Sequence, residues 1–236
     1  MEAWAPTVDQ LLTQWTAKKN LRILTFDNRG VGGTDAPWGR YTTSQMAQDI
    51  LGLMDHLNWD NAHIVGISMG GMIALEMSYV NDHGNGDMIR SLLARDPKVI
   101  VNSILTMLYP SEFLSKKMAD QDLSVRQALY NVHEHRLKTT TPPPFSGIIG
   151  HVFAVKTHFL SNDRLAAIAD AGFPVLILGA GKDRVIPGRE SATLARLIQG
   201  DHVRLTMYDD AGHGMFIQYL DEVIQDLLRN FMRAAL

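Results

Sequence analysis

Short apolar runs alternate with helical patterns along most of the chain. Runs rich in leucine, isoleucine and valine recur at residues 21–26, 62–67, 174–179 and 202–208, and such runs bounded by turn residues are typical of buried strands. Apolar residues at steps of three and four predict helices over 7–17, 43–57, 69–80, 188–199 and 214–235. Strands that alternate with helices predict an α/β fold, in which a mostly parallel sheet carries helices on both faces.

The middle of the chain departs from this alternation. Residues 81–87 form a polar, glycine-rich break, and residues 88–138 are mostly helical in pattern, although 89–94 fit a strand equally well. The run TTTPPP at 139–144 interrupts any helix, because proline lacks the amide hydrogen. We therefore expect residues 81–160 to form a helical cap insertion, and residues 1–80 and 161–236 to form the core.

A glycine-flanked serine lies between the strand predicted over 62–67 and the helix predicted over 69–80. In the elbow Gly66-Ile67-Ser68-Met69-Gly70-Gly71, an abrupt turn from strand to helix strains the serine backbone and lifts its hydroxyl clear of both elements. We expect Gly66 and Gly70 to relieve the crowding. Ser68 would then lie beside free N–H groups at a helix N-terminus, which suits developing negative charge. The same string also fits a glycine-rich helix start with Ser68 as its N-cap.

Two later loops supply partners for a serine nucleophile. Asp183 follows the strand predicted over 174–179, and His213 follows the last predicted strand. Each, like Ser68, comes just past the C-terminal end of a strand, which is the edge where open α/β sheets bind ligands. The order Ser, Asp, His predicts a triad with Ser68 as nucleophile, His213 as base and Asp183 as the acid that orients the base. Taken singly, Asp183 also fits a helix cap and His213 an ordinary loop position, and Asp96 is a weaker alternative acid.

These pieces together resemble the α/β-hydrolase superfamily over nearly the whole chain. The resemblance rests on residues 26–35 (FDNRGVGGTD), 43–57, 66–71, the Asp183 loop and 211–214 (AGHG). The elbow sequence is also similar to those of enol-lactone hydrolases, C–C bond hydrolases and cofactor-free haloperoxidases. The resemblance implies hydrolysis of a small ester-, lactone- or C–C-type carbonyl substrate through an acyl-enzyme, without a cofactor. It also implies that the Met69 N–H donates one hydrogen bond to the oxyanion. A serine at the elbow speaks against the haloalkane dehalogenase and epoxide hydrolase branches, which carry aspartate there.

Two features of that superfamily are missing from the sequence. The superfamily has strands ahead of the run at 21–26, followed by a His-Gly loop that gives a second oxyanion N–H, and the chain begins after both. We therefore expect an N-terminally truncated form with an incomplete sheet, whose backbone groups lack some partners. The alternative function is accordingly a catalytically impaired relative that binds a small apolar ligand or a partner through the same cleft.

Composition and charge exclude several classes of function and site. The formal net charge of −3 and the lack of a basic stripe argue against nucleic acid, and the absence of cysteine excludes disulfides and thiolate catalysis. His133 and His135 do not share a helix face, so we expect no metal site. Neither a signal peptide nor a membrane-length apolar run is recognisable, which favours a cytoplasmic protein that acts on a small molecule, away from membranes. The oligomeric state is not fixed by the sequence.

Overall fold

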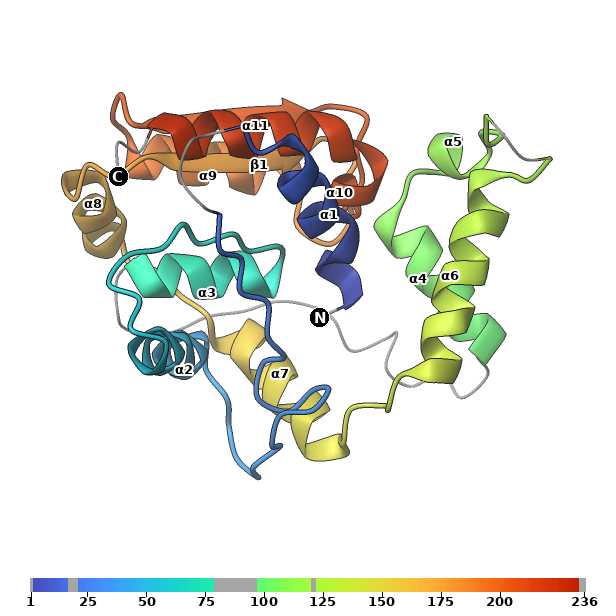
Figure 1. Ribbon diagram of the computed structural model, residues 1–236, viewed down its shortest axis with the longest axis horizontal. Coiled ribbons are helices and arrows are strands. Elements are labelled where there is room, and N and C mark those ends of the chain that lie inside the picture. Colours follow the sequence, from blue (N-terminus) through green and yellow to red (C-terminus); the bar gives the residue numbers. More distant parts are fainter. Residues whose placement is uncertain (1, 17–20, 79–96, 120–121, 234–236) are drawn as a thin grey trace.

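The computed structural model describes residues 2–16, 21–78, 97–119 and 122–233. Two strands and a larger number of helices follow one another along these residues (Figure 1). The helices that precede the strands are η1 (Glu2–Trp4), α1 (Ala5–Gln14), α2 (Thr43–His56), α3 (Met69–Ser78), α4 (Pro97–Leu108), α5 (Ser111–Leu114), α6 (Val125–Thr139), α7 (Phe145–Thr157) and α8 (Asn162–Asp170). The C-terminal part runs β1 (Val175–Ala180), α9 (Gly188–Ile198), β2 (Val203–Tyr208), α10 (Met215–Gln218) and α11 (Leu220–Arg233).

Strands β1 and β2 pair in parallel, as the alternation of strands and helices predicts. The register runs from Val175 opposite Val203 to Ala180 opposite Tyr208, so both strands end level with each other. Helix α9 connects them and packs on both. The loops that follow the two strands therefore emerge side by side, and these are the loops of Asp183 and His213.

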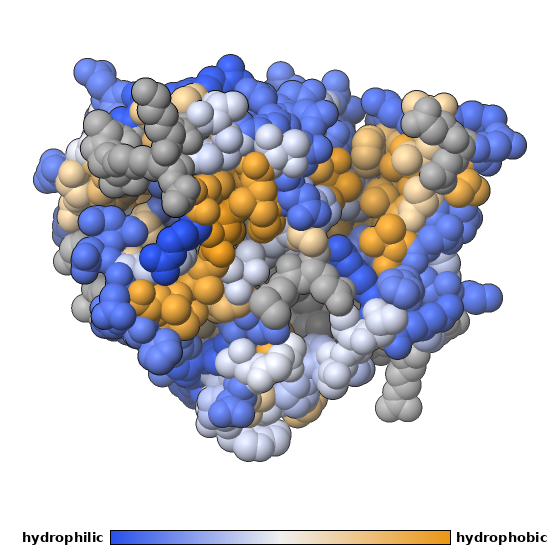
Figure 2. Space-filling model, viewed as in Figure 1, coloured by the Kyte–Doolittle hydropathy of each residue, from blue (hydrophilic) through white to orange (hydrophobic). Residues whose placement is uncertain are grey.

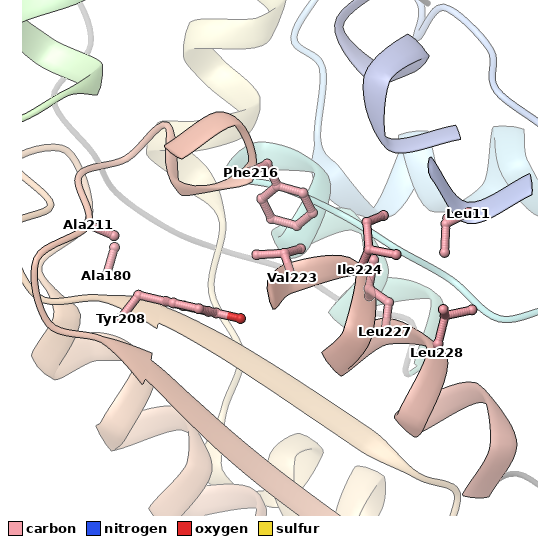
Figure 3. Close-up of a cluster of buried hydrophobic side chains, with 9 residues drawn as sticks. All are labelled: Leu11, Ala180, Tyr208, Ala211, Phe216, Val223, Ile224, Leu227 and Leu228. Atoms are coloured by element: carbon pink, nitrogen blue, oxygen red, sulfur yellow. The ribbon is translucent and has the colours of Figure 1, made fainter. Parts of the chain in front are cut away.

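Alternate side chains of β1 enter two different clusters. Ile177 lies with Leu165, Ile168 and Ile198, in the cluster formed with α8 and α9. Ala180 lies in the opposite cluster, with side chains of α1, α10 and α11 (Figure 3). Because successive strand residues point to opposite faces, this alternation places helices on both sides of the sheet. The expected α/β architecture is present, and within the described residues its sheet has two strands, fewer than the sequence predicts.

Two predicted strands are not strands in the structure. Residues 21–26 and 62–67 have no regular secondary structure and join no ladder among the described residues, and Ile23 and Ile64 are 36% and 41% exposed. Residues 21–26 cross the front of the molecule in Figure 1, and Figure 2 shows apolar side chains exposed on this face. A strand exists only when a neighbouring segment supplies hydrogen-bonding partners, which the apolar pattern alone does not guarantee. The alternative strand at 89–94 lies outside the described residues.

The helical middle of the chain divides into two parts. Helices α4, α5 and α6 stand together at one side of Figure 1, and their packing centres on Val101, Leu105, Tyr109 and Leu114. We call this unit the α4–α6 lobe. Helix α7 instead packs beside α2 and α3, where Ala154 joins a cluster with Met46 and Ile73. The boundaries of the cap insertion, 81–160, stay a prediction, since residues 79–96 lie outside the described residues.

Small residues explain how α7 approaches the loop before α2. Ser146, Gly147, Gly150 and Ala154 recur on one buried side of α7. A Cβ at Gly150 would overlap the Tyr41 ring, with its Cγ at 2.6 Å. The His151 ring also contacts the Arg29 carbonyl at 2.8 Å, so α7 is held by both packing and a hydrogen bond.

The C-terminal pattern at 214–235 forms two helices where one was predicted. Tyr219 ends α10 with non-helical backbone angles, and α11 begins at the next residue. None of the helices described here has the length and apolar character needed to cross a bilayer.

Candidate active site

The loops after β1 and β2 are tied to each other by backbone hydrogen bonds. Gly181 N–H donates to the Tyr208 carbonyl at 3.0 Å, and Lys182 N–H donates to the Ala211 carbonyl at 2.8 Å. A Cβ at Gly181 would lie 2.8 Å from the Asp209 Cα, so the close approach of the two loops requires glycine there. This contact brings Asp183 and His213 together across 30 positions of sequence.

Asp183 and His213 form a hydrogen-bonded pair. Asp183 Oδ2 lies 2.8 Å from His213 Nδ1, and their side chains are only 9% and 12% exposed. Asp183 Oδ1 accepts hydrogen bonds from the N–H groups of Val185 and Ile186, at 2.7 and 2.9 Å. An ionised Asp183 accepts, so Nδ1 carries the ring proton and Nε2 is left as an acceptor. That is the tautomer a general base needs.

The environment keeps Asp183 ionised. Burial of the carboxyl works against its ionisation, but the hydrogen bonds from His213 and from the Ile186 and Val185 N–H groups outweigh it. The pKa of Asp183 therefore lies below its ordinary value. A negative carboxylate beside Nδ1 can stabilise the imidazolium that forms when the ring accepts a proton.

The elbow has the backbone strain that its sequence predicts. Ser68 has φ = 55°, in the left-handed region that residues other than glycine rarely adopt. A Cβ at Gly66 would overlap the Gly70 carbonyl and lie 2.6 Å from the Gly71 nitrogen, so the turn requires glycine at position 66. At Gly70 a Cβ would meet nothing within 4 Å, so crowding does not demand glycine there, contrary to our expectation.

Helix α3 presents its N-terminus directly after Ser68. The Gly71 N–H donates to the Ser68 carbonyl at 2.9 Å and the Gly70 N–H to the Ile67 carbonyl at 2.8 Å. The Met69 N–H has no acceptor within the described part of the chain. An unpaired N–H next to the serine is available to a ligand oxygen, as the expected oxyanion role of Met69 needs.

The elbow and the histidine loop meet at a common cluster of apolar side chains. Ile67, just before Ser68, and Met215, just after the histidine loop, both pack against the cluster that contains Ala211 and Phe216. Within the described residues, no hydrogen bond joins Ser68 to His213. The structure thus pairs two of the three predicted residues directly and places the third on a segment that shares their core.

The sequence did not predict a buried charged cluster on α3, the helix that follows the elbow. Glu76 of α3 is fully buried, and its carboxylate accepts hydrogen bonds from Arg164 at 2.7 Å and from Ser44 at 3.0 Å. His158 Nδ1 lies 3.4 Å from the same carboxylate, and the Thr43 hydroxyl lies 3.3 Å from it. The cluster joins α2, α3 and α8, and so fixes the helix that carries the elbow. An acidic residue on the otherwise apolar helix at 69–80 was the available sequence signal.

Among the residues described, no group of three or more histidine, aspartate or glutamate side chains is arranged to hold a metal ion.

Comparison with known proteins places the chain in a family. The model of the alpha/beta hydrolase family matches residues 1–226. An AB hydrolase superfamily protein, YisY, of Bacillus subtilis is 26% identical over 91% of this chain and 82% of its own length. The 3-oxoadipate enol-lactonase 1 of Acinetobacter baylyi is 39% identical over 30% of this chain and 24% of its own length. The crystal structure of the enol-lactonase from Burkholderia xenovorans superposes with a TM-score of 0.74 at 20% identity, covering 98% of this chain and 86% of that chain. The chain therefore belongs to the alpha/beta hydrolase family.

Proposed function

We propose that the chain is a serine hydrolase that cleaves a small ester, lactone or C–C-type carbonyl substrate through an acyl-enzyme. The observation that carries the proposal is the buried Asp183–His213 pair, which leaves His213 Nε2 free to accept a proton at the edge of the sheet. The strained Ser68 on the elbow is the nucleophile that this base would serve. The two enol-lactonases among the similar proteins support a carbonyl substrate.

The first half of the reaction transfers the acyl group to the enzyme. His213 Nε2 takes the proton of the Ser68 hydroxyl while Oγ attacks the substrate carbonyl carbon. The carbonyl oxygen becomes an oxyanion, to which the Met69 N–H donates a hydrogen bond. When the tetrahedral intermediate collapses, the bond to the leaving group breaks and His213 returns the proton to that group.

Water completes the cycle. His213 takes a proton from a water molecule that attacks the acyl carbon, and Ser68 leaves with the returned proton. Asp183 stays ionised throughout and holds the ring. No cofactor enters this scheme.

A binding protein of the same family is the second candidate, because no hydrogen bond joins Ser68 to His213 within the described part of the chain. Such catalytic contacts often tighten only when substrate is bound, which is why we favour the hydrolase. A binding protein would have the same fold without the chemistry.

Labelling with a fluorophosphonate separates the two candidates. We expect covalent modification of Ser68, identified by mass spectrometry of the labelled peptide. Ser68→Ala should abolish the label, whereas Ser78→Ala, in the last turn of the same helix, should retain it. His213→Ala should slow the hydrolysis of an activated aryl ester by a factor of about 10⁴ or more. An unlabelled wild-type protein, or equal labelling of Ser68→Ala, would favour the binding protein.

A further inference from the structure

The two glycines that flank His213 are in contact with the α4–α6 lobe. A Cβ at Gly212 would lie 2.5 Å from the Leu108 carbonyl oxygen and 2.8 Å from Pro110 Cδ. A Cβ at Gly214 would overlap the Tyr109 ring, with Cζ at 2.8 Å. Contacts this short require one partner to move, so only residues without a side chain allow the lobe to lie this close.

A hydrogen bond holds the same contact. The Gly214 N–H donates to the Leu108 carbonyl at 2.8 Å, and this carbonyl belongs to the last turn of α4, where no helical partner is available. The residues Leu108, Tyr109 and Pro110, which we call the lobe corner, thus meet the chain on both sides of His213.

The lobe corner is itself firmly placed. Tyr109 is 5% exposed and belongs to the core of the lobe with Leu105 and Leu114. Its ring also packs against Phe113, with ring centroids 5.6 Å apart. We therefore expect the lobe core to resist a force on the Tyr109 ring, so that a side chain added at Gly214 displaces the histidine loop.

Asp183 fixes one ring atom of His213, while the lobe corner fixes the backbone from which the ring projects. Both are needed to define where Nε2 lies. We infer that Tyr109 is a positioning residue for His213. Through the contact of the lobe corner with the histidine loop, the lobe sets where the His213 ring lies. This inference rests on the proposed function, in which His213 moves the proton.

The substitution Gly214→Ala tests the contact. The backbone of Gly214 has φ = −83° and ψ = 29°, which alanine tolerates, so the added methyl group acts through its contact with Tyr109. Displacement of a catalytic group by about 1 Å costs about 100-fold in rate. We expect kcat for an activated aryl ester to fall about 10- to 100-fold with little change in KM, because the base and not the substrate site is displaced.

A second substitution distinguishes positioning from general damage. Tyr109→Leu removes Cε1 and Cζ, the ring atoms closest to the new methyl group, while it keeps apolar volume in the lobe core. Gly214→Ala/Tyr109→Leu should therefore regain much of the lost kcat, whereas Gly214→Ala/Tyr109→Phe, which keeps the ring, should not. Gly52→Ala is the matched control, because a Cβ there meets nothing within 4 Å.

A measurement that does not depend on turnover tests this inference separately from the proposed function. The NMR signals of the His213 imidazole, assigned by their loss in His213→Asn, should shift in Gly214→Ala. They should return towards their wild-type positions in Gly214→Ala/Tyr109→Leu. Unaltered His213 signals in Gly214→Ala, or equal recovery with leucine and phenylalanine at position 109, would overturn the positioning role. Absence of fluorophosphonate labelling in the wild-type protein would instead count against the proposed function alone.

Discussion

The buried charged cluster around Glu76 supports α3, the helix that carries the elbow. Its contribution to the free energy of unfolding can be measured, because it depends on pH. The Glu76 carboxylate is fully buried and is paired with Arg164, whose side chain is 7% exposed. Burial by itself would raise the pKa of Glu76, but the hydrogen bonds from His158, Arg164 and Ser44 outweigh it and lower this pKa to about 2 from 4.5.

The size of the effect follows from this difference in pKa. The folded state binds the Glu76 proton more weakly than the unfolded chain does, because the pKa of Glu76 is about 2 in the folded state and 4.5 in the unfolded chain. At about 1.4 kcal/mol for each tenfold difference in proton affinity, ionised Glu76 contributes about 3 kcal/mol to the free energy of unfolding. Because the folded pKa is depressed, this contribution is present above pH 4.5 and is lost as the pH falls from 4.5 towards 2.

Glu76→Gln removes the titrating group. At pH 7 the variant leaves Arg164 buried without its anion, so we expect a loss of about 3–5 kcal/mol. For a domain of this size that corresponds to a decrease in Tm of about 6–20 °C. Urea denaturation at pH values from 7 to 3 measures both effects, and the variant should lose less stability than wild type on acidification below pH 4.5.

Glu190→Gln serves as the matched control for this experiment. Glu190 is an exposed residue of α9 whose partner, Arg189, is its neighbour in sequence, and exposed pairs contribute about 0–1 kcal/mol. The control should follow the wild-type pH dependence. If wild type and Glu76→Gln lose stability in parallel below pH 4.5, the buried cluster does not support the elbow helix as we describe.

Three further substitutions test other contacts. Gly66→Ala places a methyl group against the Gly70 carbonyl and should lower both Tm and fluorophosphonate labelling. Gly70→Ala, with open space around its Cβ, should lower Tm less. Equal decreases in Tm would contradict the crowding at position 66. Asp183→Asn should keep the fold but reduce kcat about 10⁴-fold, because the amide does not hold the ring tautomer that the base requires; a reduction below tenfold in ester hydrolysis would point to another acid. Gly150→Ala should destabilise the protein by about 1–3 kcal/mol in urea denaturation by pressing on the Tyr41 ring, and unchanged stability would argue against close docking of α7.

Much of the candidate site is encoded locally. The order of Ser68, Asp183 and His213, each placed after an apolar run, was sufficient to predict which side chains should converge. The Asp183–His213 hydrogen bond agrees with that prediction, because parallel strands in register bring their following loops together. The role of Ser68 as the third member remains a prediction for the labelling experiment.

Other features depend on contacts that no local pattern carries. The runs at 21–26 and 62–67 have the composition of buried strands, yet whether they form strands depends on neighbours elsewhere in the chain. Local sequence likewise does not show the crowding at Gly66, the open space at Gly70 or the docking of Tyr109 on Gly214. Each depends on distances between segments that are remote in sequence or folded back on one another.

The sequence by itself therefore determined the helices and the two paired strands of the core, the family resemblance and the identity of the candidate catalytic residues, since each is written in periodicity or in short motifs. Only the tertiary structure decided that the runs at 21–26 and 62–67 join no ladder among the described residues, that Glu76 is buried among charges and that the α4–α6 lobe contacts the histidine loop. The physical reason is that pairing, burial and close packing are properties of two surfaces, and a single segment of sequence describes only one of them.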